Sequence, residues 1–424
     1  MSSVVRLHHG PASNMEGSRL TFRIVFLSVA MIFCMFPYTQ IIPFYSYTQP
    51  YAFLFCLIAF AIYFSSFFRK FPTCDAMGLL CFALLGLLLF LLTCFPYTSA
   101  EDQKKLLIYL GPLVFAAMAY LFVRTDPKLA RRVVSVSAVI WLVVGLVQTL
   151  IDPRFATGLV GEWQVAAVVV VDSGRGVLGL APEPTHYGFH LLLLASMIVI
   201  LRGNRLLAVS CVLGALLLAR SSSALLALIL GTGLFLFLNP KKLRVLAVPL
   251  VVAAILIFYL TDSYEVETVR LFQLLTAFVA DPTGFLVLDE SANMRLGGVI
   301  VAVKEIWSAA FMPHGMSTTS WLEEFPGIFQ RNPWLINLSE SGLPSGLLVV
   351  VYQSGFIGLF LLAIFLSKFF NYRNSDFEKW LILSVLFVFL GQYYISNPGF
   401  GLIYGFLLYA GKRRAIKTRT QADA

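Results

Sequence analysis

A succession of long apolar runs, separated by short polar segments, constrains this chain more than any other feature. About 20 apolar residues in a helix suffice to cross the hydrocarbon core of a bilayer. Of the 424 residues, 59% are hydrophobic and 12% are charged, whereas soluble domains carry roughly 25% charged residues. Candidate spans lie at 24–42, 51–68, 76–95, 106–123, 133–151, 187–201, 206–219, 223–238, 243–260, 342–367, 378–396 and 399–411. The sequence therefore predicts an all-α integral membrane protein, a bundle of about twelve transmembrane helices forming one polytopic domain over residues 1–424.

The distribution of charge predicts how these spans are oriented. A cytoplasmic N-terminus assigns most of the 31 Lys and Arg residues to inward-facing segments, and each such segment then has at least two of them. This agrees with the positive-inside rule, so both termini are expected in the cytoplasm. The first run is expected to be a retained helix. The net charge of +9 is thus explained by topology, and membrane lipids rather than nucleic acid are the expected partners.

Two external segments are long in this topology. The first is 152–186, and the second, 261–341, is far longer than an ordinary connection. Apolar faces at 266–280 and 293–311 predict helices that lie on the membrane or cap the bundle. The stretch 313–342 contains Gly and Pro signals typical of turns, and we expect it to be loop.

The six cysteines lie in or beside apolar runs, without the paired spacing of a metal site in a polar loop. We expect them to pack as small apolar side chains and to form neither disulfides nor metal sites. The short inward-facing segments have no nucleotide-binding pattern such as GxxxxGK[ST]. Neither a metal nor a cofactor is therefore expected.

The external stretch 172–188 is polar and is punctuated by glycine and proline. Two prolines flank Glu183, so the backbone there is expected to be stiff and extended, with the second proline in the first turn of a helix. This arrangement brings Arg175, Glu183 and His186 together at the mouth of a membrane helix and indicates a site. In the alternative interpretation, Glu183 only caps the helix and Arg175 only anchors at lipid headgroups.

Further ionisable and aromatic side chains gather in the segments that are expected outside. They are Arg220, Arg270, Arg295 and His314, together with Trp163, Trp307, Trp321 and Trp334. Arginine binds phosphate oxygens through paired hydrogen bonds, so several arginines over a membrane cavity favour a phosphate or diphosphate ligand. A nearby carboxylate or imidazole can accept a proton from a hydroxyl nucleophile. In the alternative interpretation the arginines only decorate helices, and the tryptophans form an interfacial aromatic belt.

Four short motifs lie one after another in about the second half of the chain. Residues 175–188, Arg-Gly-Val-Leu-Gly-Leu-Ala-Pro-Glu-Pro-Thr-His-Tyr-Gly, resemble an R-x-x-G-x-x-x-E-P-[ST]-[HF] loop, and 219–228 resemble an S-R-S-x-[ST]-x-L-L helix start. Residues 291–298, Ser-Ala-Asn-Met-Arg-Leu-Gly-Gly, and the turn at 314–317 match an N-x-R-x-G … P-L-x-G-x-G segment, although Pro-His-Gly-Met here replaces its G-x-G. Residues 352–359 match a G-[IF]-[IL]-G-L helix. Together these segments resemble the O-antigen polymerase and ligase superfamily, in its bacterial polysaccharide polymerase branch.

This resemblance implies a multi-pass membrane glycosyltransferase of the bacterial cytoplasmic (inner) membrane. Such an enzyme polymerises polyprenyl-diphosphate-linked oligosaccharide repeat units into a cell-surface polysaccharide, an O-antigen or an exopolysaccharide, on the outer face of that membrane. A chain-length regulator and a flippase of the same pathway are implied partners.

The resemblance and the residues together predict the roles of individual side chains. Catalytic roles are predicted for Glu183, Arg175, Arg295 and His314, and substrate contacts for His186, Tyr187, Arg220, Arg270 and Trp307. Arg175 and Arg295 are expected to stabilise the diphosphate leaving group. Glu183 is expected to act as the base, with His186 and His314 as alternatives.

Two other functions remain open at this point. An O-antigen ligase uses the same donor but transfers the glycan to a lipid A core, and its usual His-Asn or His-Ser pair is not well matched around His314. A multi-helix transporter is the alternative of a different class. It predicts ionisable residues in the middle of the spans, paired across helices, and the apolar runs have almost none.

Overall fold

The computed structural model describes residues 12–41, 48–95, 98–160, 168–170, 176–242, 280–281, 293–336, 343, 345–372, 375–391 and 394–422. Every regular element within these ranges is helical, and no β-strand occurs among them. The first half contains α1 (Ala12–Met35), α2 (Tyr51–Ile62), α3 (Phe64–Lys70), α4 (Thr73–Thr93), α5 (Ala100–Thr125) and α6 (Pro127–Leu150). The second half contains α8 (Pro184–Ile200), α9 (Arg205–Leu217), α10 (Ser222–Leu238), α15 (Gly298–Ser308), α16 (Thr318–Arg331), α17 (Leu348–Phe370), α18 (Asp376–Leu390) and α19 (Pro398–Ala422). Short helical turns lie at Thr157–Val160, Pro240–Lys242 and Asn293–Gly297.

The predicted all-α architecture is confirmed within the described residues. Four of the helices, α4, α5, α6 and α17, are long and apolar enough to cross a membrane. Shorter apolar helices lie at Phe22–Met35, Tyr51–Ile62, Pro184–Ile200, Arg205–Leu217 and Ser222–Leu238. A helix lies in each predicted span that falls within the described residues, whereas the span 243–260 lies outside them. The number of twelve spans stays a prediction.

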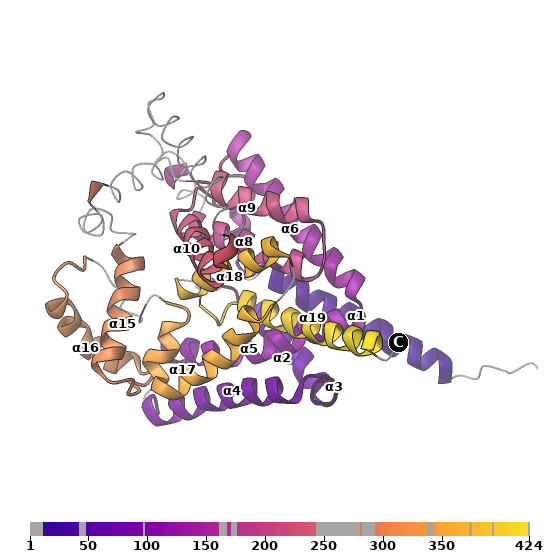
Figure 1. Ribbon diagram of the computed structural model, residues 1–424, viewed down its shortest axis with the longest axis horizontal. Helices are drawn as coiled ribbons and strands as arrows, with labels where there is room; N and C mark the ends of the chain where they lie inside the picture. The colour runs from indigo at the N-terminus through magenta and orange to yellow at the C-terminus, as the bar shows by residue number, and fades with distance from the viewer. Residues whose placement is uncertain are drawn as a thin grey trace, which may run out of the picture.

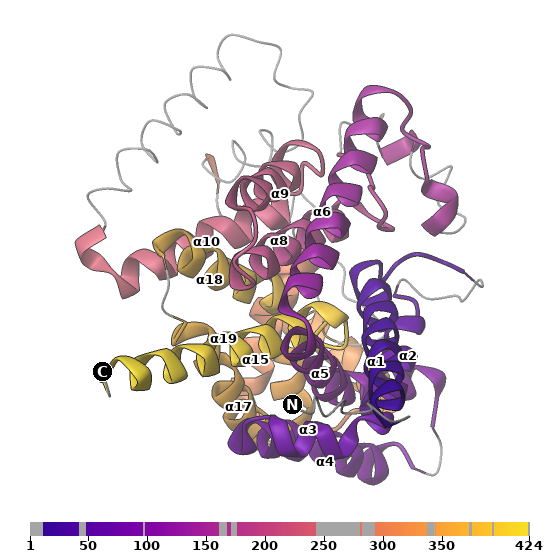
Figure 2. The same ribbon diagram turned by 90° about the vertical axis from the view of Figure 1, so that its right-hand side faces the viewer.

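The centre of the bundle is α5, whose residues 111–123 are all buried. It packs closely against α19, because a Cβ added at Gly401 would lie 2.6 Å from the Cβ of Phe115. At Gly405, one turn further along, an added Cβ would lie 2.5 Å from the carbonyl oxygen of Ala116. Small residues spaced four apart allow this close approach of two helices in a membrane. In both ribbon views α4 lies along the lower edge of the bundle and α9 lies near its top (Figures 1 and 2).

A pair of helices follows the part of the second external segment that is not described. The predicted helix at 293–311 is present, but it begins with a π-helical turn at Asn293–Gly297 and ends at Ser308. The predicted helix at 266–280 lies outside the described residues, except for Ala280. Figure 1 shows α15 and α16 side by side at one edge of the molecule, next to α17.

The prediction that 313–342 is loop is wrong, because α16 occupies Thr318–Arg331. Ser317 caps this helix, since its hydroxyl accepts a hydrogen bond from the backbone N–H of Ser320. Trp321 and Ile328 are buried at a helical spacing that gives α16 one apolar side. Pro326 stands inside the helix, and the packing of this apolar side outweighs the one backbone bond that proline removes.

The cysteines are free where the structure describes them, and four of the six are buried. These four pack as the small apolar side chains that the sequence predicts, whereas Cys74 and Cys81 are exposed on α4. Only 33% of the apolar stretch of α4 is buried in the bundle, so much of this helix faces outward. An exposed small apolar side chain is compatible with the lipid-facing side of a membrane helix.

Candidate functional site

The loop that leads into α8 lies against the turn that precedes α10. The backbone N–H of Val177 donates to the carbonyl oxygen of Leu218 at 3.0 Å. Gly176 comes so close to this turn that an added Cβ would lie 2.1 Å from the carbonyl oxygen of Ala219. Only glycine leaves room for such an approach. The two stretches that carried the first two motifs are therefore in direct contact.

The first turn of α8 continues this contact. A Cβ added at Gly188 would lie 2.9 Å from the Cβ of Ser221. Ser221 in turn caps α10, because its hydroxyl accepts a hydrogen bond from the N–H of Ala224 at 3.1 Å. Arg220, the residue before this cap, is exposed and has a φ of 44°. The left-handed backbone is strained for arginine, and it holds Arg220 at the outside of the tight turn.

Gln148 fixes the middle of the same loop. Its amide nitrogen donates to the carbonyl oxygen of Gly179 at 2.9 Å, and its amide oxygen accepts from the N–H of Gly179 at 2.7 Å. The amide nitrogen also donates to the carbonyl oxygen of Phe155. Gln148 is buried on α6, and Gly179 has a φ of 60°, which favours glycine. Sequence reasoning missed Gln148, because a single glutamine in an apolar run is a weak signal.

Glu183 immediately precedes α8, and its backbone is extended, with φ −144° and ψ 153°. This agrees with the conformation that the flanking prolines predict, and Pro184 does lie in the first turn of the helix. The side chain of Glu183 makes no hydrogen bond to the helix N-terminus. The alternative interpretation as a cap is therefore wrong for this side chain, which is half-buried.

Tyr187 was predicted to contact substrate, and the structure contradicts this. The side chain is fully buried, and its hydroxyl donates to the carbonyl oxygen of Trp141 at 3.0 Å. Its ring also covers Gly179, where an added Cβ would lie 2.6 Å from the ring. Tyr187 therefore packs beneath the loop and holds it in place. The ring of His186, which is half-buried, lies 5.8 Å from the ring of Tyr38.

The other predicted residues fall into two groups. Arg175 and Arg270 lie outside the described residues. Arg295 belongs to the π-helical turn Asn293–Gly297, where its backbone alone is described. Trp307 lies on α15 with 74% of its surface exposed, so it is open to lipid or ligand. Within the described residues, the structure brings Glu183, His186 and the Arg220 turn into one region and places His314 in another.

The region of His314 depends on a break in α17. At Gly355 this helix has φ 63° and ψ −143°, and its regular hydrogen bonding is interrupted. The backbone N–H groups of His314 and Gly315 donate instead to the carbonyl oxygens of Tyr352 and Gln353, at 3.1 and 3.0 Å. A side chain at Gly355 would collide with the carbonyl oxygen of Phe311. The glycine of the fourth motif therefore lets the preceding segment dock onto the open helix.

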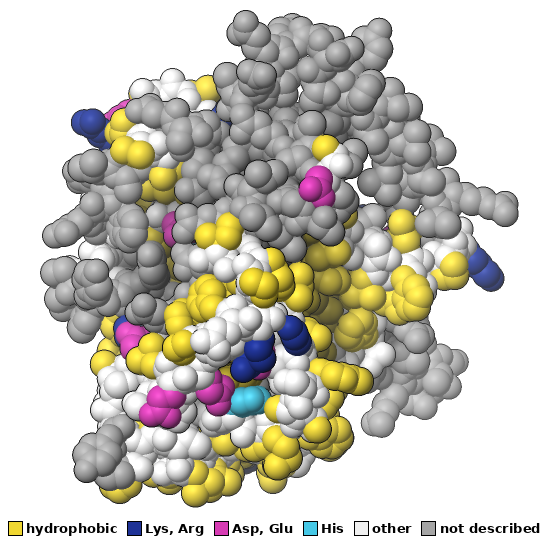
Figure 3. Space-filling model, turned by 90° about the vertical axis from the view of Figure 1, so that its left-hand side faces the viewer, with side chains coloured by type: hydrophobic (Ala, Val, Ile, Leu, Met, Phe, Trp, Pro, Cys, Tyr) yellow, Lys and Arg dark blue, Asp and Glu magenta, His cyan; other side chains and the backbone are white. Residues whose placement is uncertain are grey.

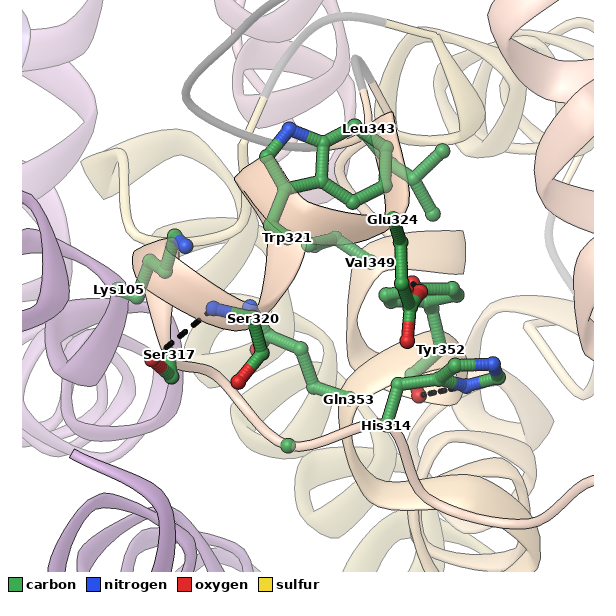
Figure 4. Close-up of a pocket in the computed structure, with 11 residues that line it drawn as sticks. Lys105, His314, Ser317, Ser320, Trp321, Glu324, Leu343, Val349, Tyr352 and Gln353 are labelled. Carbon is green, nitrogen blue, oxygen red and sulfur yellow. Dashed lines mark hydrogen bonds between the residues drawn. The ribbon is translucent and has the colours of Figure 1, made fainter. Parts of the chain in front are cut away.

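A small pocket that is partly open to solvent lies beside this break. It is formed by the start of α5, by α16 with the segment before it, and by the first turns of α17 (Figure 4). Figure 3 views this face of the molecule, where a histidine is visible between acidic and basic side chains. Of the residues with a role predicted from the sequence, His314 is the one that lines the pocket within the described part of the chain.

Aromatic rings form one wall of the pocket. The imidazole of His314 stacks on the ring of Tyr352, with centroids 4.0 Å apart and an angle of 12°. Trp321 meets the same tyrosine edge-on, at 5.8 Å and 89°. The hydroxyl of Tyr352 donates to Glu324 Oε2 at 2.6 Å, which places the carboxylate next to these rings (Figure 4). The close-up shows Glu324, Tyr352 and His314 grouped on one side of the pocket.

Polar groups from α5 and α17 complete the pocket. Lys105 Nζ donates to the hydroxyl of Thr318 at 3.0 Å, and this hydroxyl donates to Asp102 Oδ1 at 2.7 Å. Asp102 Oδ1 also accepts the N–H of Thr318, so this carboxylate ties the first turn of α16 to α5. On the opposite side Tyr109 donates to Gln353 Oε1 at 3.2 Å, which leaves the amide N–H groups of Gln353 as donors.

The two regions offer different chemistry. The loop before α8 carries ionisable groups on a tightly fixed backbone, and the pocket combines aromatic faces with a carboxylate, an ammonium group, an amide and an imidazole. A pocket in which hydrogen-bond donors and acceptors converge can bind a ligand that carries several hydroxyl groups. Among the described residues, no group of three or more His, Cys, Asp or Glu side chains is placed to hold a metal ion.

Comparison with protein-family models finds no match to this chain. A comparison with curated proteins likewise finds no significant match.

Proposed function

We propose that this protein polymerises polyprenyl-diphosphate-linked oligosaccharide repeat units on the outer face of a bacterial cytoplasmic membrane. The observation that carries the proposal is the contact between the first two motif segments. Gly176 lies against Ala219 and Gly188 lies against Ser221, although some 30 residues separate the two segments in the chain. Both glycines belong to the first motif segment, and the contact gives each of them a physical reason. This proximity supports the proposal that the two segments form one site.

The proposed topology has twelve spans, with both termini in the cytoplasm. Polar contacts between distant segments support this alternation. Arg205 pairs with Glu378, and Lys368 pairs with Asp75, and the topology assigns all four residues to the inward end. Thr48 donates to Asn397, which the topology assigns to the same outward end. No described ion pair joins an inward segment to an outward one.

The proposed reaction transfers the glycan from its lipid diphosphate to a hydroxyl of a second lipid-linked repeat unit. The acceptor oxygen bonds to the anomeric carbon, the bond from that carbon to the diphosphate breaks, and the polyprenyl diphosphate leaves. Arg175 and Arg295 are proposed to stabilise the charge that develops on the diphosphate, with Arg220 as a further phosphate contact. The hydroxyl proton passes to Glu183, whose carboxylate is not used as a helix cap.

The reaction needs neither a nucleotide sugar nor a bound cofactor. The energy of the diphosphate linkage to the donor drives it, and the protein supplies positioning and charge. Arg270 and Trp307 remain proposed contacts to the glycan. A flippase that delivers the repeat units and a regulator of chain length remain the proposed partners in the membrane.

Deletion of the gene from its host tests the proposal. Single repeat units on the lipid carrier should accumulate, and long polymer should disappear from the cell surface. Polymer of normal length that accumulates on the lipid carrier without attachment to a lipid A core would identify a ligase instead. Unchanged polymer and unchanged carrier-linked glycan would contradict both transferase functions.

The same strain tests the arginines. Complementation with Arg175→Lys or Arg295→Lys should fail nearly as completely as with the alanine variants, because lysine lacks the planar fork that grips a diphosphate. Arg202→Lys, at an exposed turn on the opposite end of α8, is a matched control and should restore polymer. Full polymer in both lysine variants, at normal protein level, would remove the proposed role of the arginines.

A further inference from the structure

We propose that the pocket between α5, α16 and α17 holds one sugar residue of the acceptor glycan, an inference that rests on the proposed function. The pocket is separate from the loop that is proposed to handle the diphosphate. Its flat aromatic wall is the first observation that points to a sugar. The stacked pair His314 and Tyr352, with Trp321 edge-on to it, offers apolar surface beside polar groups. A pyranose ring likewise has C–H groups on its face and hydroxyl groups around its rim.

The polar groups around this wall match the rim of a sugar. Glu324 can accept hydrogen bonds, whereas Lys105 and the amide nitrogen of Gln353 can donate them. Ser320, which also lines the pocket, can do both. A sugar hydroxyl both donates and accepts, so a mixture of acceptors and donors satisfies several hydroxyls at once. Gln353 is buried, and its amide orientation is fixed by Tyr109 on the far side.

The same groups argue against the other two parts of a lipid-linked substrate. A diphosphate requires several donors or cations, but Glu324 is a carboxylate in the pocket wall and would repel a polyanion. Lys105 is the only Lys or Arg among the lining residues, and it already donates to Thr318. A polyprenyl chain has no polar groups to satisfy Glu324, Lys105 and Gln353, whose burial without hydrogen bonds is costly.

The position of the pocket agrees with an acceptor site. The N–H of Met316 donates to the hydroxyl of Thr93 at the end of α4, which ties the pocket to that end of the bundle. The proposed topology assigns this end to the outside, where the acceptor glycan lies.

Direct binding tests the inference. The probe is the oligosaccharide released by mild acid from the host's own lipid-linked repeat units, which carries neither lipid nor diphosphate. It is titrated by calorimetry into the purified full-length protein in detergent. Glu324→Ala should raise the dissociation constant at least about tenfold, because the variant removes a hydrogen-bond acceptor from the pocket. Tyr352→Phe, which releases the carboxylate from its hydroxyl partner, should raise it by a smaller factor.

Glu323 and Lys104 provide matched controls, because each stands next to a pocket residue of the same type. Glu323→Ala, one position before Glu324 on the same helix, should bind the oligosaccharide as the wild type does, because Glu323 does not line the pocket. Lys105→Met should weaken binding, whereas Lys104→Met, on an exposed side of α5, should not. The Lys105 variant keeps the test decisive if Glu324→Ala does not fold. Equal affinity in wild type, Lys105→Met and every folded Glu324 or Tyr352 variant would overturn the inference.

The deletion strain separates failure of this inference from failure of the proposed function. If the proposed function is wrong, deletion leaves the polymer unchanged. If only the pocket inference is wrong, deletion abolishes the polymer, but Glu324→Ala and Lys105→Met restore it to full length and bind the oligosaccharide normally. The expected result is that both variants give shortened polymer, and that Glu323→Ala and Lys104→Met give polymer of wild-type length.

Discussion

The backbone of the loop that leads into α8 lies in close contact with its neighbours, whereas the pocket beside α16 is lined by side chains from three separate elements. In the loop, Gly176 and Gly179 leave no space for a further carbon atom, and Gln148 occupies both backbone groups of Gly179. In the pocket, the walls meet through side-chain hydrogen bonds such as that from Tyr352 to Glu324. The first region is therefore rigid by construction, and the second can change by substitution of side chains.

This difference suits the two parts of the proposed substrate. A polyprenyl diphosphate is the same group in every donor, and a fixed backbone can present charges to it in one arrangement. The sugars differ from one polysaccharide to another, and a pocket built from side chains can be adapted without disturbing the helices. We therefore expect the loop to be sensitive to added atoms and the pocket to be sensitive to lost polar groups.

The largest effect is expected for Glu183→Gln. Glutamine keeps the size of the side chain and an acceptor oxygen, but it cannot take a proton from a hydroxyl. General-base assistance is worth roughly 10²–10⁴-fold in rate, so long polymer should vanish and single repeat units should remain on the lipid carrier. Polymer length on gels and the carrier-linked glycan are measured together. Polymer of normal length from this variant would move the role of base to His186 or His314.

The sequence predicted the helical fold and the extended backbone before α8, because the signals there are local. Apolar runs mark the helices, and a glutamate between two prolines defines an extended entry to α8. Tyr187 shows the limit of this reasoning. It stands beside ionisable residues in the chain, yet it points into the core, and the chain order alone does not reveal this direction.

The pocket could not be predicted in the same way, because its residues come from distant segments. Lys105 and Gln353 are unremarkable in isolation, and their proximity depends on the break in α17 at Gly355. Glu324 was missed because the Gly and Pro residues of 313–342 predicted a loop there. In fact Pro326 lies inside α16, where the apolar side formed with Trp321 keeps the helix intact.

A smaller effect, on stability rather than chemistry, is expected for Gly176→Ala. The new Cβ would meet backbone atoms of Ala219 at 2.1–2.2 Å, and backbone cannot move aside as a flexible side chain can. Overpacking of this kind costs about 1–3 kcal/mol or more. Gly233→Ala on α10 is the matched control, because nothing lies within 4 Å of its added Cβ. Alanine there should be neutral or stabilising by up to about 1 kcal/mol.

Thermal unfolding of the two purified variants in detergent measures this contrast. The melting temperature of Gly176→Ala should fall and that of Gly233→Ala should not. If both glycines accept alanine equally well, the loop is not closed in the way that the contact with Ala219 indicates, and the comparison between the two regions loses its basis.

The smallest effect is expected for Thr318→Val, which tests how the pocket is held together. Valine preserves the shape of threonine, so the substitution removes only the hydroxyl that links Lys105 to Asp102. The backbone N–H of residue 318 still donates to Asp102 Oδ1, so one of the two tethers between α16 and α5 remains. Loss of a hydrogen bond to a charged group costs about 1.5–3 kcal/mol at most, and the remaining tether reduces the effect. Amide hydrogen exchange should therefore increase in the first turns of α16, while exchange in α5 and the overall melting temperature stay unchanged.

Thr319→Val, at the exposed neighbouring position, is the control and should leave exchange in α16 as in the wild type. A fall in the overall melting temperature with Thr318→Val would show that α16 is part of the cooperative core, and that the pocket is as rigid as the loop before α8.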